Sequence, residues 1–272
     1  MTSFRPEPQC TLATVCLLVF AWQTDPGSPL IVAANRDERL DRPARSLCVL
    51  RDREPRVLGG RDDLAGGTWL AVNEQGVVAG LTNRPSPGGR DPTKRSRGEL
   101  PLIAAAEWSA DDGVAELSRR VRPGEYNPAW LLVGDRRSLY YVELTLDREP
   151  SVRQLGPGIH VLENTAIGEP SPKVDRVHAL LAAGAAGRSL WEAVPTVLCD
   201  HTVPVGVGAP SGSDHTERPP ATLAACVHTD DYGTRSAALV RVGSDPDIPP
   251  DMLVADGPSC VTAFIDVGDR WS

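Results

Sequence analysis

The chain has 272 residues, with 28 Lys and Arg side chains against 36 Asp and Glu side chains and a net charge of −8. A chain of this length can bury a large core without disulfide bonds, as one large domain or two small ones. The acidic balance argues against nucleic acid or an anionic membrane surface as a partner, because both bind basic protein faces.

Two apolar runs near the N-terminus predict a β-hairpin. Residues 16–22 and 29–35 are apolar, and residues 23–28 between them contain the turn residues Asp, Pro and Gly. Continuous apolar runs of this kind indicate strands that are covered on both faces. The first run extends back to residue 10, but the segment before it is barely basic and no small-residue cleavage site follows. We therefore expect no secretory signal, no membrane span and a cytoplasmic protein.

A second hairpin and a pair of helices are predicted next. Residues 51–66 are charged and contain several glycines, which indicates a loop. Residues 68–73 and 77–83 are two predicted strands around a Glu-Gln-Gly turn. Apolar residues at helical spacing then predict helices at residues 97–108 and 110–121.

The rest of the chain continues with strands, helices and strands again. The expected strands span 129–134, 139–143 and 160–164, the expected helices span 174–183 and 189–198, and the last expected strands span 221–229, 236–242, 252–255 and 261–266. Residues 208–220 are polar and rich in proline, which is typical of a surface loop. Segregated runs of strands and helices predict an α+β fold with antiparallel sheets. Because several strands need cover on both faces, we expect a four-layer αββα sandwich in a single domain at residues 16–272.

The segment Ala34-Asn35-Arg36-Asp37-Glu38 places four polar side chains directly after an apolar strand. Loops at the ends of strands commonly present catalytic groups, because the rigid scaffold fixes their positions. The structural alternative is a solvated turn that contains an Arg–Asp ion pair.

The same segment resembles the motif that names the NRDE family, also called the transport and Golgi organisation protein 2 family. Further segments resemble that family's motifs in the same order along the chain. They are Gly66-Gly67-Thr68-Trp69-Leu70, Leu81-Thr82-Asn83, Arg97-Gly98-Glu99-Leu100, Leu162-Glu163-Asn164, Pro170-Ser171-Pro172-Lys173 and Tyr232-Gly233-Thr234-Arg235. The resemblance extends from about Cys16 to Val242, which is most of the chain.

This resemblance implies an N-terminal-nucleophile hydrolase-like fold, which agrees with the four layers expected from the strands. The family is more remotely similar to choloylglycine hydrolases and penicillin V acylases, which use an N-terminal Cys, an Asp, two Asn and a late Arg. The catalytic residues implied by this similarity are Cys16, Asp37, Asn83, Asn164 and Arg235. In one departure, those hydrolases carry an Arg where this chain has Ala34, and Arg36 is the candidate to supply that charge or the catalytic role is lost.

The implied chemistry is attack of the Cys16 thiol on an amide carbonyl, with the free α-amine of the same residue as general base. Asp37 would orient and charge-balance this pair, and the amides of Asn83 and Asn164 would donate to the oxyanion. Arg235 would lower the pKa of the thiol. We also expect substrate contacts from other residues of the same motifs, namely Asn35, Arg36, Trp69, Thr82 and Tyr232.

Each assignment has a structural alternative. Cys16 can be an ordinary strand cysteine, the two asparagines can be turn residues, and Arg235 can pair with Asp230 or Asp231. We expect an amidohydrolase that acts on a non-peptide C–N bond, and the alternatives are a binding or trafficking protein or a degenerate hydrolase scaffold used for interactions. The family's links to haem and lipid metabolism would admit haem as a ligand, although the sequence has no C-x-x-C-H motif.

The six cysteines and five histidines show no spacing that is typical of a metal site. No C-x-x-C pair is present, so we expect Cys48, Cys226 and Cys260 to be small hydrophobic residues of the interior. The histidines are expected to be structural or solvent-facing. We therefore predict no metal and no cofactor.

A free α-amine requires Cys16 to be the first residue of the mature chain. We expect residues 1–15 to be a disordered extension, or upstream sequence before the true start at position 15. Valine can be encoded by GTG, which also serves bacteria as a start codon, and methionine removal after a start at position 15 would expose Cys16. Autocatalytic cleavage would have the same result, whereas a retained tail would block the amine.

Overall fold

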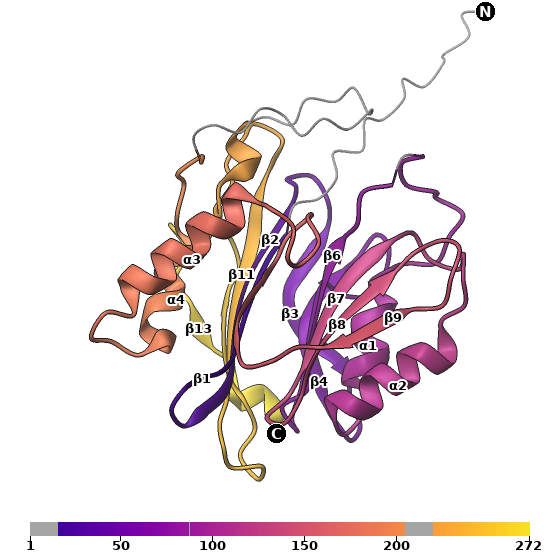
Figure 1. Cartoon of the computed structure of the whole chain (residues 1–272), viewed down its shortest axis with the longest axis horizontal. Coiled ribbons are helices and arrows are strands. Elements are labelled where there is room, and N and C mark those ends of the chain that lie inside the picture. Colours follow the sequence, from indigo (N-terminus) through magenta and orange to yellow (C-terminus); the bar gives the residue numbers. More distant parts are fainter. Residues whose placement is uncertain (1–15, 87, 205–219) are drawn as a thin grey trace, which may run out of the picture.

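Figure 1 shows the computed structural model, in which residues 16–86, 88–204 and 220–272 are described. The strands of these residues form two antiparallel sheets. The first has the order β10 (Gly158–Leu162), β1 (Leu17–Asp25), β2 (Ser28–Arg39), β11 (Tyr232–Val242), β12 (Asp251–Ala255) and β13 (Ile265–Asp266). The second runs in sequence order through β3 (Ala44–Arg51), β4 (Val57–Asp62), β5 (Leu70–Asn73), β6 (Val78–Asn83), β7 (Ala129–Gly134), β8 (Leu139–Leu144) and β9 (Ser151–Gln154).

Two helix pairs cover the outer faces of these sheets. Figure 1 shows α1 (Glu99–Ala105) and α2 (Ala110–Arg120) against the second sheet, and α3 (Pro172–Gly184) and α4 (Leu190–Leu198) against the first. Short 3-10 helices are formed by Pro220–Leu223 and Gly268–Trp271. None of the helices within the described ranges is long and apolar enough to cross a lipid bilayer.

Alternate residues of the first hairpin face different layers, which explains why its strands are apolar throughout. Leu18 and Phe20 of β1 pack in the core between the two sheets, whereas Leu17 and Val19 pack against α3 and α4. The other face of the second sheet packs against α1 and α2. The predicted αββα sandwich is therefore confirmed, and the α+β class with antiparallel sheets is confirmed with it.

The predicted loop at residues 51–66 is wrong, because β4 lies inside it. The glycines that suggested a loop are packing positions of a strand. A Cβ atom on Gly59 would lie 2.2 Å from the carbonyl oxygen of Leu70, and one on Gly60 would lie 2.0 Å from the ring of Trp69. Only glycine allows the neighbouring chain to approach β4 so closely.

Other elements also differ from the prediction. Strands β3 and β9 were not predicted, and of the strand expected at residues 261–266 only β13 at Ile265–Asp266 is formed. The strand expected at residues 221–229 is instead a 3-10 helix followed by an isolated bridge between His228 and Gly233. Of the loop expected at residues 208–220, all but Pro220 lies outside the described residues. Residues 1–15, the predicted extension, also lie outside them.

Two of the glycine-containing motifs contact each other at the start of α1. Gly67 has a φ of +88°, and the backbone N–H of Thr68 donates to the carbonyl oxygen of Gly98 over 2.9 Å. A Cβ atom on Gly67 would lie 2.4 Å from the carbonyl carbon of Gly98, whereas one on Gly66 would meet nothing within 4 Å. The contact holds the loop before β5 against the N-terminus of α1.

We expect Gly67→Ala to destabilise the protein more than Gly66→Ala. Both glycines have positive φ, so each substitution should cost about 1 kcal/mol of backbone strain. Only the Gly67 variant adds a clash with backbone atoms, which should cost at least about 2 kcal/mol more. Urea unfolding of both variants measures the difference, and equal midpoints would contradict the close contact between the two motifs.

Candidate active site

Cys16 lies immediately before β1, at the end of the first sheet where three chain segments meet. Leu17 pairs with Asn35 of β2, and Leu18 pairs with Leu162 of β10. The polar segment at the end of β2 therefore lies on one side of Cys16. The segment that follows β10, which contains Asn164, lies at the same end of the sheet on the other side.

Asp37 is a fully buried carboxylate beside Cys16, with 0% exposed surface. The hydroxyl of Thr234 on β11 donates to its Oδ1 over 2.5 Å, and the Lys173 ammonium lies 3.9 Å from its Oδ2. Burial raises the pKa of Asp37 to about 6, although Lys173, Thr234 and Arg36 each act to lower it. The carboxylate is thus poised to change its charge near physiological pH.

Lys173 is the site residue that we did not predict. It occupies the first turn of α3, after Ser171 accepts the Val174 N–H and caps the helix. Its side chain is 2% exposed, and a lysine is almost never this deeply buried without an anionic partner. Within the described ranges, neither Lys173 Nζ nor Asp37 Oδ2 makes a hydrogen bond, so both atoms are left to interact with a further polar group. In the sequence, Lys173 could have been recognised as a site residue from its position in the Pro170-Ser171-Pro172-Lys173 motif.

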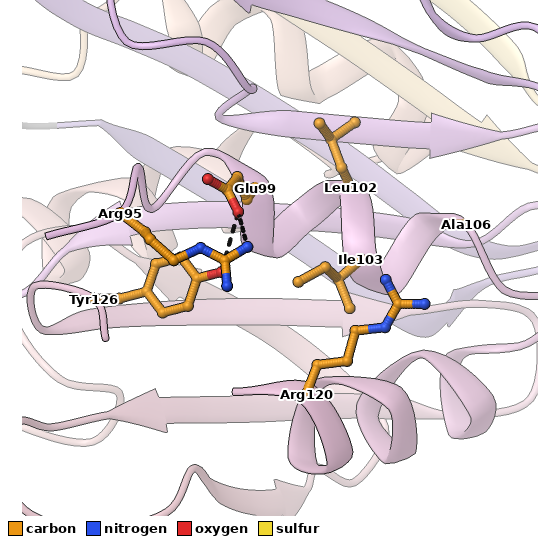
Figure 2. Close-up of a pocket in the computed structure, with 7 residues that line it drawn as sticks. All are labelled: Arg95, Glu99, Leu102, Ile103, Ala106, Arg120 and Tyr126. Atoms are coloured by element: carbon orange, nitrogen blue, oxygen red, sulfur yellow. Dashed lines mark hydrogen bonds and ion pairs between the residues drawn. The ribbon is translucent and has the colours of Figure 1, made fainter. Parts of the chain in front are cut away.

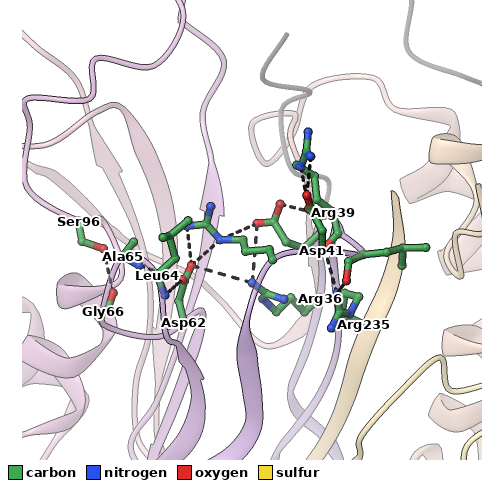
Figure 3. Close-up of polar contacts among 12 residues, drawn as sticks. Arg36, Arg39, Asp41, Asp62, Leu64, Ala65, Gly66, Ser96 and Arg235 are labelled. Carbon is green, nitrogen blue, oxygen red and sulfur yellow. Dashed lines mark hydrogen bonds and ion pairs between the residues drawn. The ribbon is translucent and has the colours of Figure 1, made fainter. Parts of the chain in front are cut away.

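Arg36 lies between the two sheets, next to Cys16. Its guanidinium carbon lies 4.4 Å from the ring centroid of Trp69, in a cation–π arrangement. Its Nη2 lies 3.7 Å from Glu38 and 4.0 Å from Asp62 of β4, and Figure 3 shows Arg36 reaching toward Asp62. Burial lowers the pKa of Arg36, and these acids oppose that effect. Two of the predicted substrate-binding residues, Arg36 and Trp69, are therefore in contact.

The Cys16 thiol is protonated at neutral pH in this chain. Burial raises its pKa to about 12, and the charges of Asp37 and Glu38 act in the same direction. Arg36 and a hydrogen bond from the Asp37 backbone act to lower the pKa. Arg97 is a second cation whose charge interacts with that of Cys16, and burial lowers the pKa of Arg97 to about 10. A further positive charge is needed to produce a thiolate here.

Arg36 is the arginine that most lowers the pKa of Cys16, a role that we had expected for Arg235. Arg235 lies at a bulge in the pairing of β11 with β2. Its guanidinium donates to the carbonyl oxygens of Arg39 and Leu40, and it thereby fixes the end of β2 (Figure 3).

The other predicted residues occupy different positions around this end of the sheets. Asn164 is 7% exposed and Tyr232 is 2% exposed. Asn83 ends β6, and the neighbouring Thr82 is buried. The amide nitrogen of Asn35 donates to the carbonyl oxygens of Leu198 and Ala225, so Asn35 holds α4 against β2 instead of presenting its N–H groups to a substrate.

A separate pocket of about 290 Å³ lies on the outer side of the second sheet. Figure 2 shows it beside α1 and α2, with Arg95 and Tyr126 both directed at Glu99. None of the predicted catalytic or substrate-binding residues lines it. The candidate site is therefore defined by the polar cluster around Cys16 and not by this pocket.

We expect Asp37→Asn to change how stability depends on pH. Asp37 ionises near pH 6 in the folded protein but at about pH 4 when unfolded. The folded state thus loses stability as the pH rises from about 4 to 6, and the asparagine removes this loss. Relative to wild type, the variant should gain up to about 3 kcal/mol between about pH 4 and pH 7.

Urea unfolding at both pH values measures this gain. Asp41→Asn is the control with the opposite sign, because Arg39 lowers the pKa of that exposed carboxylate. If Asp37→Asn and wild type differed by the same amount at both pH values, the raised pKa of Asp37 would be disproved.

Known proteins resemble this chain along most of its length. The model of the family described as Transport and Golgi organisation 2 matches residues 15–248. The Transport and Golgi organization protein 2 homolog of Bos taurus is 31% identical over 253 residues, a match that covers 85% of this chain and 90% of the relative. The Mus musculus homolog is 31% identical over 173 residues, which covers 59% of this chain and 60% of the relative.

Solved structures with the same fold have much lower sequence identity. The Caenorhabditis elegans N-acylethanolamine-hydrolyzing acid amidase ortholog matches with a TM-score of 0.53 and 13% identity, over 86% of this chain and 94% of that chain. A variant of the conjugated bile acid hydrolase from Clostridium perfringens matches with a TM-score of 0.50 and 15% identity, over 93% of each chain. At 13% and 15% sequence identity, these matches show a shared fold and nothing more. The chain therefore belongs to the Transport and Golgi organisation 2 family, and its fold is that of the N-terminal-nucleophile hydrolases.

Proposed function

We propose that this protein is a cytoplasmic cysteine N-terminal-nucleophile amidohydrolase that cleaves a non-peptide C–N bond. The observation that carries the proposal is the position of Cys16 at the end of β1, where its sulfur accepts a hydrogen bond from the Asp37 backbone beside a fully buried carboxylate. Two solved structures of the same fold are named for the hydrolysis of N-acylethanolamines and of conjugated bile acids. A single domain at residues 16–272 would hold the whole site.

The reactive form in this proposal begins at Cys16, with its α-amine free. The Cys16 sulfur attacks the amide carbonyl carbon, and the thiol proton passes to the α-amine. The C–N bond then breaks as the α-ammonium gives this proton to the departing nitrogen, which leaves an acyl thioester. Water attacks the thioester and loses a proton to the α-amine, the C–S bond breaks, and the acid is released with the thiol restored.

The surrounding residues stabilise charges that form along this path. Asp37 balances the α-ammonium, and Lys173 keeps the carboxylate ionised in its buried position, since its charge acts to lower the pKa of Asp37. Arg36 favours the thiolate form of Cys16. The amides of Asn83 and Asn164 are the proposed oxyanion donors, where one well-placed donor lowers the barrier by about 3 kcal/mol.

The substrate would bind at the same end of the sheets. Trp69, Thr82 and Tyr232 are the proposed contacts, and the guanidinium of Arg36 stacked on Trp69 offers a cationic and aromatic surface. Arg235 is proposed to position β2 through the carbonyl oxygens that it binds.

We expect the chain that starts at Cys16 to react faster with iodoacetamide at Cys16 than the 272-residue chain does. With residue 15 attached, burial holds the pKa of the thiol at about 12. A free α-ammonium adds a positive charge beside the sulfur, and each unit by which the pKa falls raises the thiolate fraction about tenfold. Mass spectrometry after a short pulse at neutral pH measures the rate at Cys16, and the half-buried Cys48 serves as the internal control.

Equal rates at Cys16 in the two chains would contradict activation by the amine. The intact mass of protein expressed from its native upstream DNA shows separately whether the mature chain begins at Cys16.

We expect Cys16→Ser to abolish the hydrolysis of fluorogenic N-acyl amides by the chain that starts at residue 16. Loss of an essential nucleophile lowers kcat by at least about 1,000-fold in comparable enzymes. Cys48→Ser is the matched control, because Cys48 lies on β3 outside the cluster around Cys16. A panel of amides with short, long and aromatic acyl groups gives the rates. Turnover by the Cys16→Ser protein at the wild-type rate would show that Cys16 is not the nucleophile.

A second candidate function is ligand binding without catalysis, with haem or a lipid as cargo on a degenerate hydrolase scaffold. One observation favours it: in a chain that retains residue 15, burial raises the pKa of Cys16 to about 12, which disfavours the nucleophilic thiolate at neutral pH. Titration of both chain forms with haemin, followed in the Soret region, distinguishes this function. Saturable haemin binding by a chain without amidase activity would support it.

A further inference from the structure

A cluster of two cysteines and two histidines lies on the helix side of the first sheet. Its members are His201, Cys226, His228 and Cys260, and one ligand atom from each lies within 4.8 Å of every other. Cys226 is buried and Cys260 is half-buried, whereas both histidines are exposed. The sequence suggested no metal site, because only Cys226 and His228 of these four residues are close together along the chain. His201 and Cys260 come from distant parts of it.

We propose that these four side chains bind one Zn²⁺ ion in a tetrahedral Cys2His2 site. The Sγ atoms of Cys226 and Cys260 lie 3.7 Å apart. His228 Nε2 lies 3.7 Å from the first sulfur and 3.3 Å from the second. Zinc–sulfur bonds of about 2.3 Å and zinc–nitrogen bonds of about 2.0 Å at tetrahedral angles give edges of about 3.8 Å between sulfurs and about 3.5 Å between sulfur and nitrogen.

His201 is the fourth ligand of the proposed site, with one ring nitrogen within 4.8 Å of the other three ligand atoms. Its Nδ1 lies 3.1 Å from the carbonyl oxygen of Cys226. With the proton on Nδ1 the ring donates to this oxygen, and the lone pair on Nε2 is left to bind a metal. Metal-binding histidines usually have this second hydrogen bond, because it fixes the tautomer and the ring direction. The ring of His201 packs 5.0 Å from that of His228, centroid to centroid.

Hydrogen bonds between neighbouring segments bring His201, Cys226 and Cys260 together. The Cys226 N–H donates to the carbonyl oxygen of Asp200 over 2.9 Å, which joins the segments that carry the two ligands His201 and Cys226. The Ser259 hydroxyl donates to the carbonyl oxygen of Leu198 over 2.7 Å, which brings Cys260 to the same place. The site is thus preorganised from three chain segments. Two soft thiolates and two imidazoles are a donor set that selects zinc over magnesium or calcium.

Val227, which lies between Cys226 and His228, connects the proposed zinc site to the candidate active site. The Val227 N–H donates to the Thr234 hydroxyl oxygen over 2.9 Å, and that hydroxyl donates to Asp37 Oδ1 over 2.5 Å. Because Cys226 and His228 flank Val227, a zinc ion bound by both side chains would fix the position of the Val227 N–H. The role of the metal would therefore be structural, in holding Thr234 in the orientation that Asp37 requires.

The full-length protein, purified without chelators, tests the proposal by elemental analysis and by cobalt substitution. We expect close to one zinc per chain. After removal of zinc, we expect Co²⁺ to produce the visible absorption of a tetrahedral centre and an ultraviolet thiolate-to-cobalt band. Each of Cys226→Ser and Cys260→Ser should weaken the thiolate band and lower zinc affinity by at least about 100-fold. Cys48→Ser should change neither.

His228→Ala is the second test, because this exposed side chain can be removed with little effect on packing. It should lower zinc affinity to a similar extent while the circular dichroism spectrum stays unchanged. Three results would overturn the proposal: octahedral cobalt without a thiolate band, zinc affinity unaffected by the Cys226 and His228 variants, or a disulfide between Cys226 and Cys260 in protein alkylated during lysis. None of these readouts depends on amidase activity.

Discussion

A carboxylate with no exposed surface must be surrounded by donors or cations, and the partners of Asp37 determine how distant parts of this fold come together. Thr234 reaches it because β11 pairs with β2, and Lys173 reaches it because α3 begins at the same end of the first sheet. Cys16 lies beside it because β1 pairs with the other edge of β2. The site is thus assembled around one buried negative charge, from four segments that are separated along the chain.

The positive charges are divided between the two sides of the first sheet. Lys173 acts on Asp37 from the layer of α3, whereas Arg36 lies between the sheets against Trp69 and near Asp62. Each cation is almost fully buried, so solvent does little to screen either of them. Cys16 lies directly before β1, where the charge of Asp37 acts to raise the pKa of its thiol and the charge of Arg36 acts to lower it.

The layers of the fold could be predicted from the sequence, because strands covered on both faces must be apolar throughout. Strand β4 could not be predicted, because adjacent glycines such as Gly59 and Gly60 are typical of loops. Their close packing against Leu70 and Trp69 is visible only in three dimensions. The family motifs indicated Cys16, Asp37 and Arg36 as neighbours. They did not indicate that Lys173 faces Asp37, or that His201 and Cys260 meet Cys226, because such contacts depend on how α3, α4 and the last segments pack.

Successive residues of β2 belong to different layers of the molecule. Asn35 and Asp37 contact the helix side through Leu198 and Lys173, and Arg36 between them contacts the opposite sheet. A slip of one residue in the pairing of β1 with β2 would exchange these faces, since side chains alternate along a strand. The guanidinium would then face the helices, and the carboxylate would enter the apolar core. The pairing of β1 with β2 beyond the irregularity between Trp22 and Asp25 therefore decides which charged side chain of the site faces the helices and which faces the second sheet.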